Sequence, residues 1–210
     1  MKERIVLDRF EIRLSGTGGQ GILTLGRILG QGLSIGLGYY VTQTQSYGPE
    51  ARGGASRSDL VISSRPISYP KTENVDLLVA LSQEACNNYY RQLKPRGVLL
   101  IDTGLVKQTP TNIFLGLPFT RLTEEKIKVP QAMNSVVLGA MAWILPFAAR
   151  GILRKSLEES LPEKVRAVNV KAFNLGYTQA EKTLGEKPTF WSGEQPTEEA
   201  PSDATQEAEV

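Results

Sequence analysis

The first strand of this chain is visible in the alternation of apolar and polar residues near its start. In FEIRLSG (residues 10–16), Phe10, Ile12 and Leu14 alternate with Glu11 and Arg13. This period of two predicts a strand with one buried face. Five later segments, bounded by glycine, proline or polar residues, also predict strands: YYVTQTQ (39–45), ASRSDLVIS (55–63), VDLLVAL (75–81), VLLIDTG (98–104) and NIFLGLPF (112–119).

Between these strands, apolar residues recur at helical spacing. Helices are predicted at 22–38, at 83–93, over a short stretch at 121–128, and at two longer stretches around 133–150 and 162–184. Gly26 and Gly30 share one face of the first helix, which indicates close packing against a sheet or a partner. Strands alternating with helices predict an α/β fold. We expect a three-layer single domain with a Rossmann-like mixed or parallel sheet and helices on both faces.

The charge is unevenly distributed along the chain. The net charge of the 210 residues is +2, which does not indicate a nucleic-acid-binding protein. Residues 186–210 hold seven acidic residues and one lysine, leaving 23 basic against 15 acidic residues in 1–185. We therefore expect a basic domain at 1–185, suited to an anionic ligand, and an acidic, disordered tail at 186–210.

The residue types present exclude several kinds of chemistry. The chain has one cysteine, Cys86, and no histidine. An internal disulfide, a zinc site built on Cys or His, a Ser-His or Cys-His pair and a four-cysteine iron–sulfur cluster are therefore excluded. Cys86 is expected to be a buried, inert thiol in a helix. The start of the chain has no signal-like apolar run, and the longest apolar segment is interrupted by Pro146 and Arg150, so we expect a cytoplasmic protein without a membrane span.

The stretch SGTGGQG (residues 15–21) joins a predicted strand to a predicted helix. Gly16, Gly18 and Gly21 satisfy G-x-G-x-x-G, a pattern that lets a phosphate approach the backbone at a helix start. The alternative is a tight turn without a ligand. An NAD site would need an acidic residue about 20 positions later, but the first acid is Glu50. A P-loop would need Lys and Ser/Thr where Ile22 and Leu23 stand.

A second loop, SYGPEARGG (residues 46–54), carries a carboxylate and a guanidinium beside paired glycines. Loops that follow parallel strands meet at one edge of an open sheet, so this loop and the glycine turn are expected to line one crevice. Arg52 suits a phosphate or carboxylate ligand, although an ion pair between Glu50 and Arg52 is the alternative. Asn134 is expected to cap the helix after Pro130, with a ligand or interface contact left open.

Several segments together carry a family resemblance, of which QTQSYGPEARGGASRSD (43–59) is the most specific. The chain resembles the gamma subunit of 2-oxoacid:ferredoxin oxidoreductases over residues 8–182, and it looks most like the 2-oxoglutarate branch. The other matching stretches are SGTGGQGILTLGRILGQ (15–31), YPKTENVDLLVALSQEA (69–85), NSVVLGAM (134–141) and VKAFNLGY (170–177).

The resemblance implies oxidative decarboxylation of a 2-oxoacid, with coenzyme A (CoA) as acyl acceptor and external ferredoxin as electron acceptor. It implies that thiamine diphosphate, Mg and iron–sulfur clusters belong to alpha, beta and small ferredoxin-like delta subunits. It implies no catalytic or metal-binding residue here, so the isolated chain is expected to be inactive. The residues expected to contact CoA are Gly16, Thr17, Gly18, Gly19, Gln20 and Gly21, with Ser46, Tyr47, Glu50, Arg52, Gly53 and Gly54 at the second loop.

Three alternatives remain open at this point. The first is a gamma subunit of a pyruvate or branched-chain 2-oxoacid enzyme. The second is a standalone nucleotide-binding module, and the third is a purely structural subunit whose glycine turn serves packing. The pairing of Arg52 with two glycines favours a ligand over packing, because packing alone does not require a guanidinium.

Overall fold

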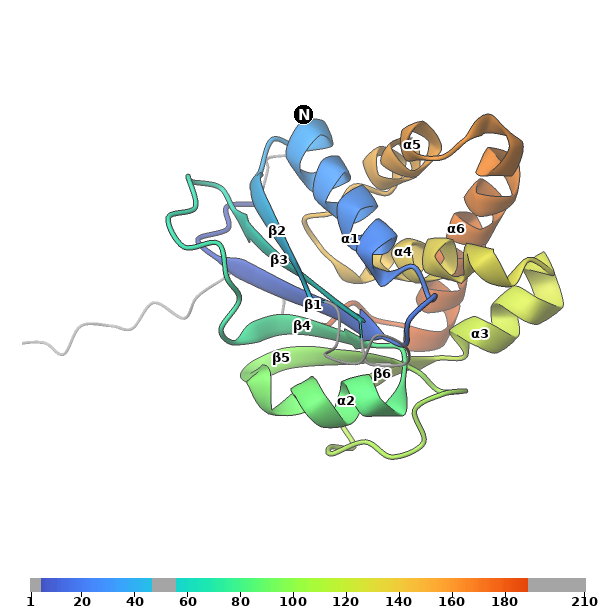
Figure 1. Cartoon of the computed structure of the whole chain (residues 1–210), viewed down its shortest axis with the longest axis horizontal. Helices are drawn as coiled ribbons and strands as arrows, with labels where there is room; N and C mark the ends of the chain where they lie inside the picture. The colour runs from blue at the N-terminus through green and yellow to red at the C-terminus, as the bar shows by residue number, and fades with distance from the viewer. Residues whose placement is uncertain (1–4, 47–55, 189–210) are drawn as a thin grey trace, which may run out of the picture.

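A computed structural model describes residues 5–46 and 56–188 and places a six-stranded sheet between layers of helices (Figure 1). The strands are β1 (Phe10–Gly16), β2 (Tyr40–Ser46), β3 (Ser56–Ser63), β4 (Val75–Ala80), β5 (Leu93–Asp102) and β6 (Leu115–Leu117). The α-helices are α1 (Ile22–Gln31), α2 (Gln83–Tyr89), α3 (Phe119–Leu122), α4 (Met133–Ile144), α5 (Arg150–Ser160) and α6 (Glu163–Leu184). Of the predicted tail, only residues 186–188 lie in the described part.

The strand order is β2-β3-β1-β4-β5-β6. Strands β1, β4, β5 and β6 are parallel, whereas β3 pairs antiparallel with both β1 and β2. The predicted mixed, Rossmann-like sheet is therefore confirmed. Because β1 and β2 both run opposite to β3, they point the same way and end at the same edge of the sheet.

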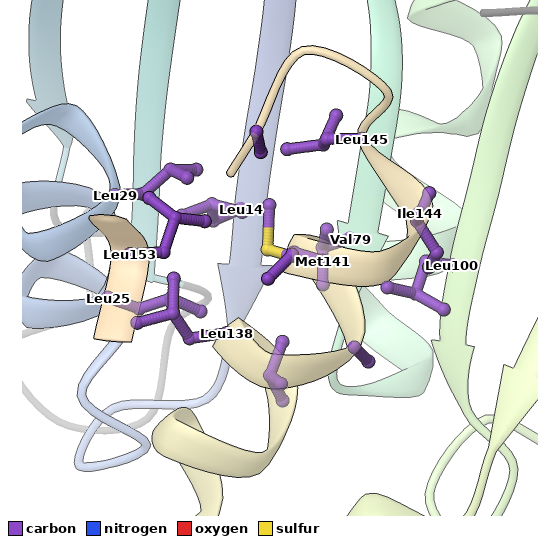
Figure 2. Packing of buried hydrophobic residues seen from close by; sticks show 14 of the residues in the cluster. Leu14, Leu25, Leu29, Val79, Leu100, Leu138, Met141, Ile144, Leu145 and Leu153 are labelled. Carbon is purple, nitrogen blue, oxygen red and sulfur yellow. The ribbon is translucent and has the colours of Figure 1, made fainter. Parts of the chain in front are cut away.

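Helices cover both faces of the sheet, as predicted. Helices α1, α4, α5 and α6 lie on one face and α2 lies on the other (Figure 1). Leucines of α1 and the apolar residues of α4 meet the strands in one continuous core (Figure 2). Every residue of α4 except Asn134 is buried, which is typical of a helix enclosed on all sides.

Glycines set how closely these helices approach their neighbours. A Cβ at Gly26 would overlap the hydroxyl of Ser58 on β3, so the predicted close packing of α1 on the sheet is confirmed. Between α4 and α6 the approach is closer still. A Cβ at Gly139 would overlap the carbonyl oxygen of Phe173, and one at Gly176 would overlap that of Val136. The two helices therefore cross with their backbones in direct contact.

The prediction that β1 has only one buried face is wrong. Glu11 and Arg13 are each only 3% exposed. The guanidinium of Arg13 makes a bidentate pair with Asp59 on β3, at 2.7 and 2.8 Å, and lies 5.0 Å from the centre of the Tyr89 ring. Paired charges can be buried where isolated ones cannot, so the polar face of β1 is enclosed as well.

The predicted helix around 133–150 is also wrong at its end. Helix α4 ends at Ile144, and a separate helix, α5, begins at Arg150 and was not predicted. Pro146 lies between them and prevents one continuous helix, because proline has no N–H to donate within a helix. Within the described residues, no helix is both long enough and apolar enough to cross a bilayer.

Candidate functional site

The glycine turn connects β1 to α1 at the carboxyl edge of the sheet. Strand β1 ends at Gly16, and α1 begins after Gly21, which has φ of 69°. Gly19 has φ of 90°. Both values lie in the left-handed region that L-residues rarely adopt. The predicted strand–turn–helix context of the motif is therefore confirmed, and at these two positions glycine is required by the backbone itself.

Neighbouring elements hold the turn in place. The Gln20 amide oxygen accepts a hydrogen bond from the Thr17 N–H at 2.8 Å, and its NH₂ group donates to the Leu81 carbonyl oxygen at 3.0 Å. The Leu81 N–H in turn donates to the Ser15 carbonyl oxygen at 2.8 Å. The Gln20 side chain thus links the turn to the end of β4. The conformation of the turn is set by the protein before any ligand binds, which favours binding because less ordering is required.

The Asn134 side chain also holds the glycine turn in place. Its predicted role as a helix cap is wrong. Residue Ala132 occupies the N-cap position of α4, without a side-chain hydrogen bond, and Asn134 lies inside the first turn. The Asn134 NH₂ group donates to the Gly21 carbonyl oxygen at 3.2 Å. Because 113 residues separate this pair, no local sequence pattern identifies the contact.

The outer side of the turn is open. Thr17, Gly18 and Gly19 are exposed, and a Cβ built at Gly18 or Gly19 would meet no atom of the described residues within 4 Å. Helix α1 has neither a side-chain cap nor an acidic residue in its first turn. The free N–H groups at the start of α1 and the positive end of its dipole therefore have no acidic partner within the first turn of the helix. These are the features that favour an anion at a helix start.

The second predicted loop begins and ends at the same edge of the sheet. Ser46 pairs with Arg57, and Ser56 pairs with Gly16, so β3 alone separates the ends of β1 and β2. Ser46 itself is half-buried. The remaining predicted residues lie outside the described residues, so the shared crevice stays a prediction: Tyr47, Glu50, Arg52, Gly53 and Gly54.

A cavity of about 220 Å³ lies beside the first turn of α1 and was not predicted. It lies among α1, α4, α5 and α6, and its lining includes Thr24 from the first turn of α1 and Asn134 beside Gly21. Most of the other lining residues are aliphatic. Their spacing along the helices resembles that of ordinary core positions, so the sequence pattern alone does not distinguish them from packing residues.

Other polar groups near the sheet edge have structural partners. Asp102, at the end of β5, is buried and accepts hydrogen bonds from the Thr120 N–H, the Thr120 hydroxyl and the Gly104 N–H, at 2.6 to 2.8 Å. Its carboxylate therefore joins β5 to α3. Within the described ranges, no cluster of three or more His, Cys, Asp or Glu side chains is placed to hold a metal ion.

Cys86 is a free, fully buried thiol on α2, as predicted. Burial raises the pKa of this thiol above its usual range, because desolvation penalises the thiolate. Since the thiolate is the reactive form, the position and protonation of Cys86 both oppose reaction.

We expect Cys86 to resist alkylation in the folded protein at pH 7.5, because both reagent access and thiolate formation are blocked. Mass spectrometry after treatment with N-ethylmaleimide measures this directly. The same chain in 6 M guanidinium chloride is the control and should be labelled completely. Equal labelling rates with and without the denaturant would show that Cys86 is accessible in the native state.

Comparison with known proteins gives consistent matches along most of the chain. A family model described as "Pyruvate ferredoxin/flavodoxin oxidoreductase" matches residues 11–179. The 2-oxoglutarate synthase subunit KorC of Methanocaldococcus jannaschii is 42% identical over 186 residues, which cover 87% of this chain and 100% of that protein.

Two solved structures have the same fold. The gamma subunit of a keto/oxoacid ferredoxin oxidoreductase from Geobacter sulfurreducens superposes with a TM-score of 0.77 at 36% identity, covering 84% of this chain and 98% of that one. The 2-oxoglutarate:ferredoxin oxidoreductase of Magnetococcus marinus, solved with 2-oxoglutarate, coenzyme A and succinyl-CoA bound, gives a TM-score of 0.75 at 23% identity. The match covers 87% of this chain and 32% of that chain.

Proposed function

Because the chain belongs to the pyruvate ferredoxin/flavodoxin oxidoreductase family, as a gamma subunit most like that of the 2-oxoglutarate enzyme, we propose that its glycine turn binds coenzyme A. The complex it serves would convert 2-oxoglutarate, CoA and oxidised ferredoxin to succinyl-CoA, CO₂ and reduced ferredoxin in the cytoplasm. The 2-oxoglutarate assignment of the KorC relative and the CoA bound to the Magnetococcus enzyme support this proposal.

The observation that carries the proposal is the combination of a braced turn with an open outer side. The Gln20 and Asn134 amides fix the backbone, while Thr17, Gly18 and Gly19 leave space for a ligand. A phosphate that lies on this turn can accept hydrogen bonds from backbone N–H groups and interact favourably with the dipole of α1. We propose that the diphosphate of CoA occupies this position and that the basic body of the chain assists its approach.

The redox and carbanion chemistry is assigned to other subunits. The family's iron–sulfur clusters do not fit the residues of this chain, which offers a single buried cysteine and no histidine as cluster ligands. We propose that alpha, beta and delta subunits hold these clusters, thiamine diphosphate and Mg, and that the gamma chain binds CoA and packs against its partners. Its own contribution is to hold one substrate in position for a reaction at a neighbouring chain.

Replacing Gly18 by valine tests the CoA site without disturbing the fold. Gly18 has no positive φ, and a Cβ there meets no neighbouring atom in the part of the chain that the structure describes. The valine side chain would instead occupy the space in front of the turn. We expect the KM for CoA of the assembled complex to rise by at least about tenfold, equal to about 1.4 kcal/mol of lost binding. The melting temperature and subunit composition should not change.

Gly151→Val is the matched control, because Gly151 also has open space around its Cα but lies on α5. It should leave the KM for CoA unchanged. If Gly18→Val assembles normally and the KM for CoA is unaltered, the turn does not bind CoA. Turnover of a 2-oxoacid by the isolated chain would contradict the assignment of the chemistry to other subunits.

A further inference from the structure

We propose that the cavity among α1, α4, α5 and α6 accepts the adenine base of the CoA whose phosphates lie on the glycine turn. This inference rests on the proposed function and adds the part of the ligand that the turn does not contact. It names a second subsite on the same chain, formed by residues that lie up to 145 positions apart in the sequence, from Thr24 to Asn169.

The cavity lies next to the phosphate position. Thr24 lines the cavity from the first turn of α1, whose N-terminus begins the proposed phosphate site. Asn134 lines the cavity from the other side, and its NH₂ group contacts the Gly21 carbonyl oxygen at 3.2 Å. One helical turn rises about 5.4 Å. A ribose spans a gap of this size, so a nucleotide can place its phosphate on the turn and its base in the cavity.

The size of the cavity suits one ring system rather than a whole ligand. Pockets that enclose a complete small molecule usually measure about 300–1,000 Å³, and this one measures about 220 Å³. The cavity is therefore smaller than a site for the whole of CoA, which is the size expected of a subsite for one part of the ligand.

The lining has the chemistry of a purine site. Aliphatic side chains that include Ile28, Leu138 and Val168 form its walls, and such walls contact the faces of a flat ring. Ligand pockets of this kind add a few polar groups that fix orientation. Here Thr24 and Gln131 contribute a hydroxyl and an amide that make no hydrogen bond to the described part of the chain. Amide side chains match the adjacent donor and acceptor on the adenine edge.

Filling the cavity with a larger side chain tests whether it binds the base of CoA and not the pantetheine part. Val168→Phe adds bulk to the cavity wall on α6. The assembled complex carrying this variant is titrated with CoA, with 3′,5′-ADP, which has the base but no pantetheine, and with 4′-phosphopantetheine, which has no base. We expect the Kd to rise by at least about tenfold for CoA and 3′,5′-ADP. The Kd for 4′-phosphopantetheine should be unchanged.

Val170→Phe is the control, because Val170 lies on the same helix and does not line the cavity. It should leave all three Kd values unchanged. If Val168→Phe weakens none of the ligands, or weakens 4′-phosphopantetheine as much as 3′,5′-ADP, the base does not occupy the cavity.

A measurement on the unmodified complex keeps the proposal testable if Val168→Phe does not fold. The 1,N⁶-etheno derivative of CoA blocks the hydrogen-bonding edge of adenine, so we expect it to bind at least about tenfold more weakly than CoA. Equal affinity would overturn the proposal. A different result is expected if the glycine turn does not bind CoA at all. The unmodified complex would then bind neither CoA nor 4′-phosphopantetheine at the turn, and Gly18→Val would change neither affinity.

Discussion

Gly176→Ala is expected to destabilise the chain by roughly 3 kcal/mol, the upper end of the usual range for overpacking. The added methyl group would overlap the carbonyl oxygen of Val136 and lie 2.9 Å from its Cα. Both atoms belong to the backbone of the buried helix α4, which cannot move aside without displacing the core. Domains of this kind are stable by only about 5–15 kcal/mol. Urea unfolding followed by circular dichroism measures the change.

The matched control is Gly151→Ala on α5, where a Cβ meets open space. Alanine has the higher helix propensity, but Gly151 lies in the first turn of α5, so this variant should gain less than the roughly 1 kcal/mol expected in a helix interior. Because neither variant loses helix propensity, a loss of stability in Gly176→Ala alone reports the contact of α4 with α6. If the two variants were equally stable, the helices would not be in backbone contact at Gly176.

Asp59→Ala is expected to destabilise the chain by about 3–5 kcal/mol, as is usual when one member of a buried ion pair is removed. Arg13 would keep its position in a closed environment, with its guanidinium beside Tyr89 and Thr72. One of its nitrogens, Nη1, already lacks a hydrogen-bond partner among the described residues. The loss of both bonds to Asp59 would leave the buried charge largely uncompensated. Thermal and urea unfolding measure the effect.

Two further variants separate this effect from a general loss of charge. The double replacement Arg13→Met with Asp59→Leu removes both charges together, and we expect it to recover most of the stability lost in Asp59→Ala. Asp8→Ala disrupts an exposed pair with Arg65 and should change stability little. A double variant as unstable as Asp59→Ala would show that shape, and not an unpaired charge, determines the cost.

The spacing of apolar residues predicted most of the strands and helices correctly. In those elements, the spacing follows directly from which side chains face the core and which face solvent. The continuous apolar run at 75–81 became β4 in the middle of the sheet, and the glycine turn lies between β1 and α1 as predicted. Helix α5 was missed because its apolar residues are few, although Leu153 and Leu157 lie on one buried face of the helix. It is stabilised mainly by packing against other helices, which local periodicity does not record.

Long-range pairing explains the remaining errors. Arg13 looks like a solvent-facing residue until Asp59, 46 positions later, is placed beside it. In the same way, Asn134 resembles a helix cap because its local context is that of a helix start. Its contact with Gly21 depends on how α4 packs beside α1. In both cases the tertiary fold brings the two residues together, and their spacing in the sequence does not predict the contact.

The candidate site was predictable only in part, for the same reason. The glycines of the turn are recognisable because their backbone conformation requires them. Most residues that line the cavity come from four helices. Within any single helix, their spacing is that of ordinary core positions. The predicted contribution of Arg52 and its neighbours lies outside the described residues, so it stays a prediction.

The pairing of β2 with β3 has a consequence for loop engineering. The two strands are joined by backbone hydrogen bonds in one register from Tyr40 and Ser63 to Ser46 and Arg57, before the connection at 47–55 begins. A change in the length of that connection alters loop-closure entropy by only about 0.6 kcal/mol per doubling. The stability of the sheet therefore depends little on the length of the connection, so a loop-grafting experiment can change that length while the pairing of β2 with β3 is retained.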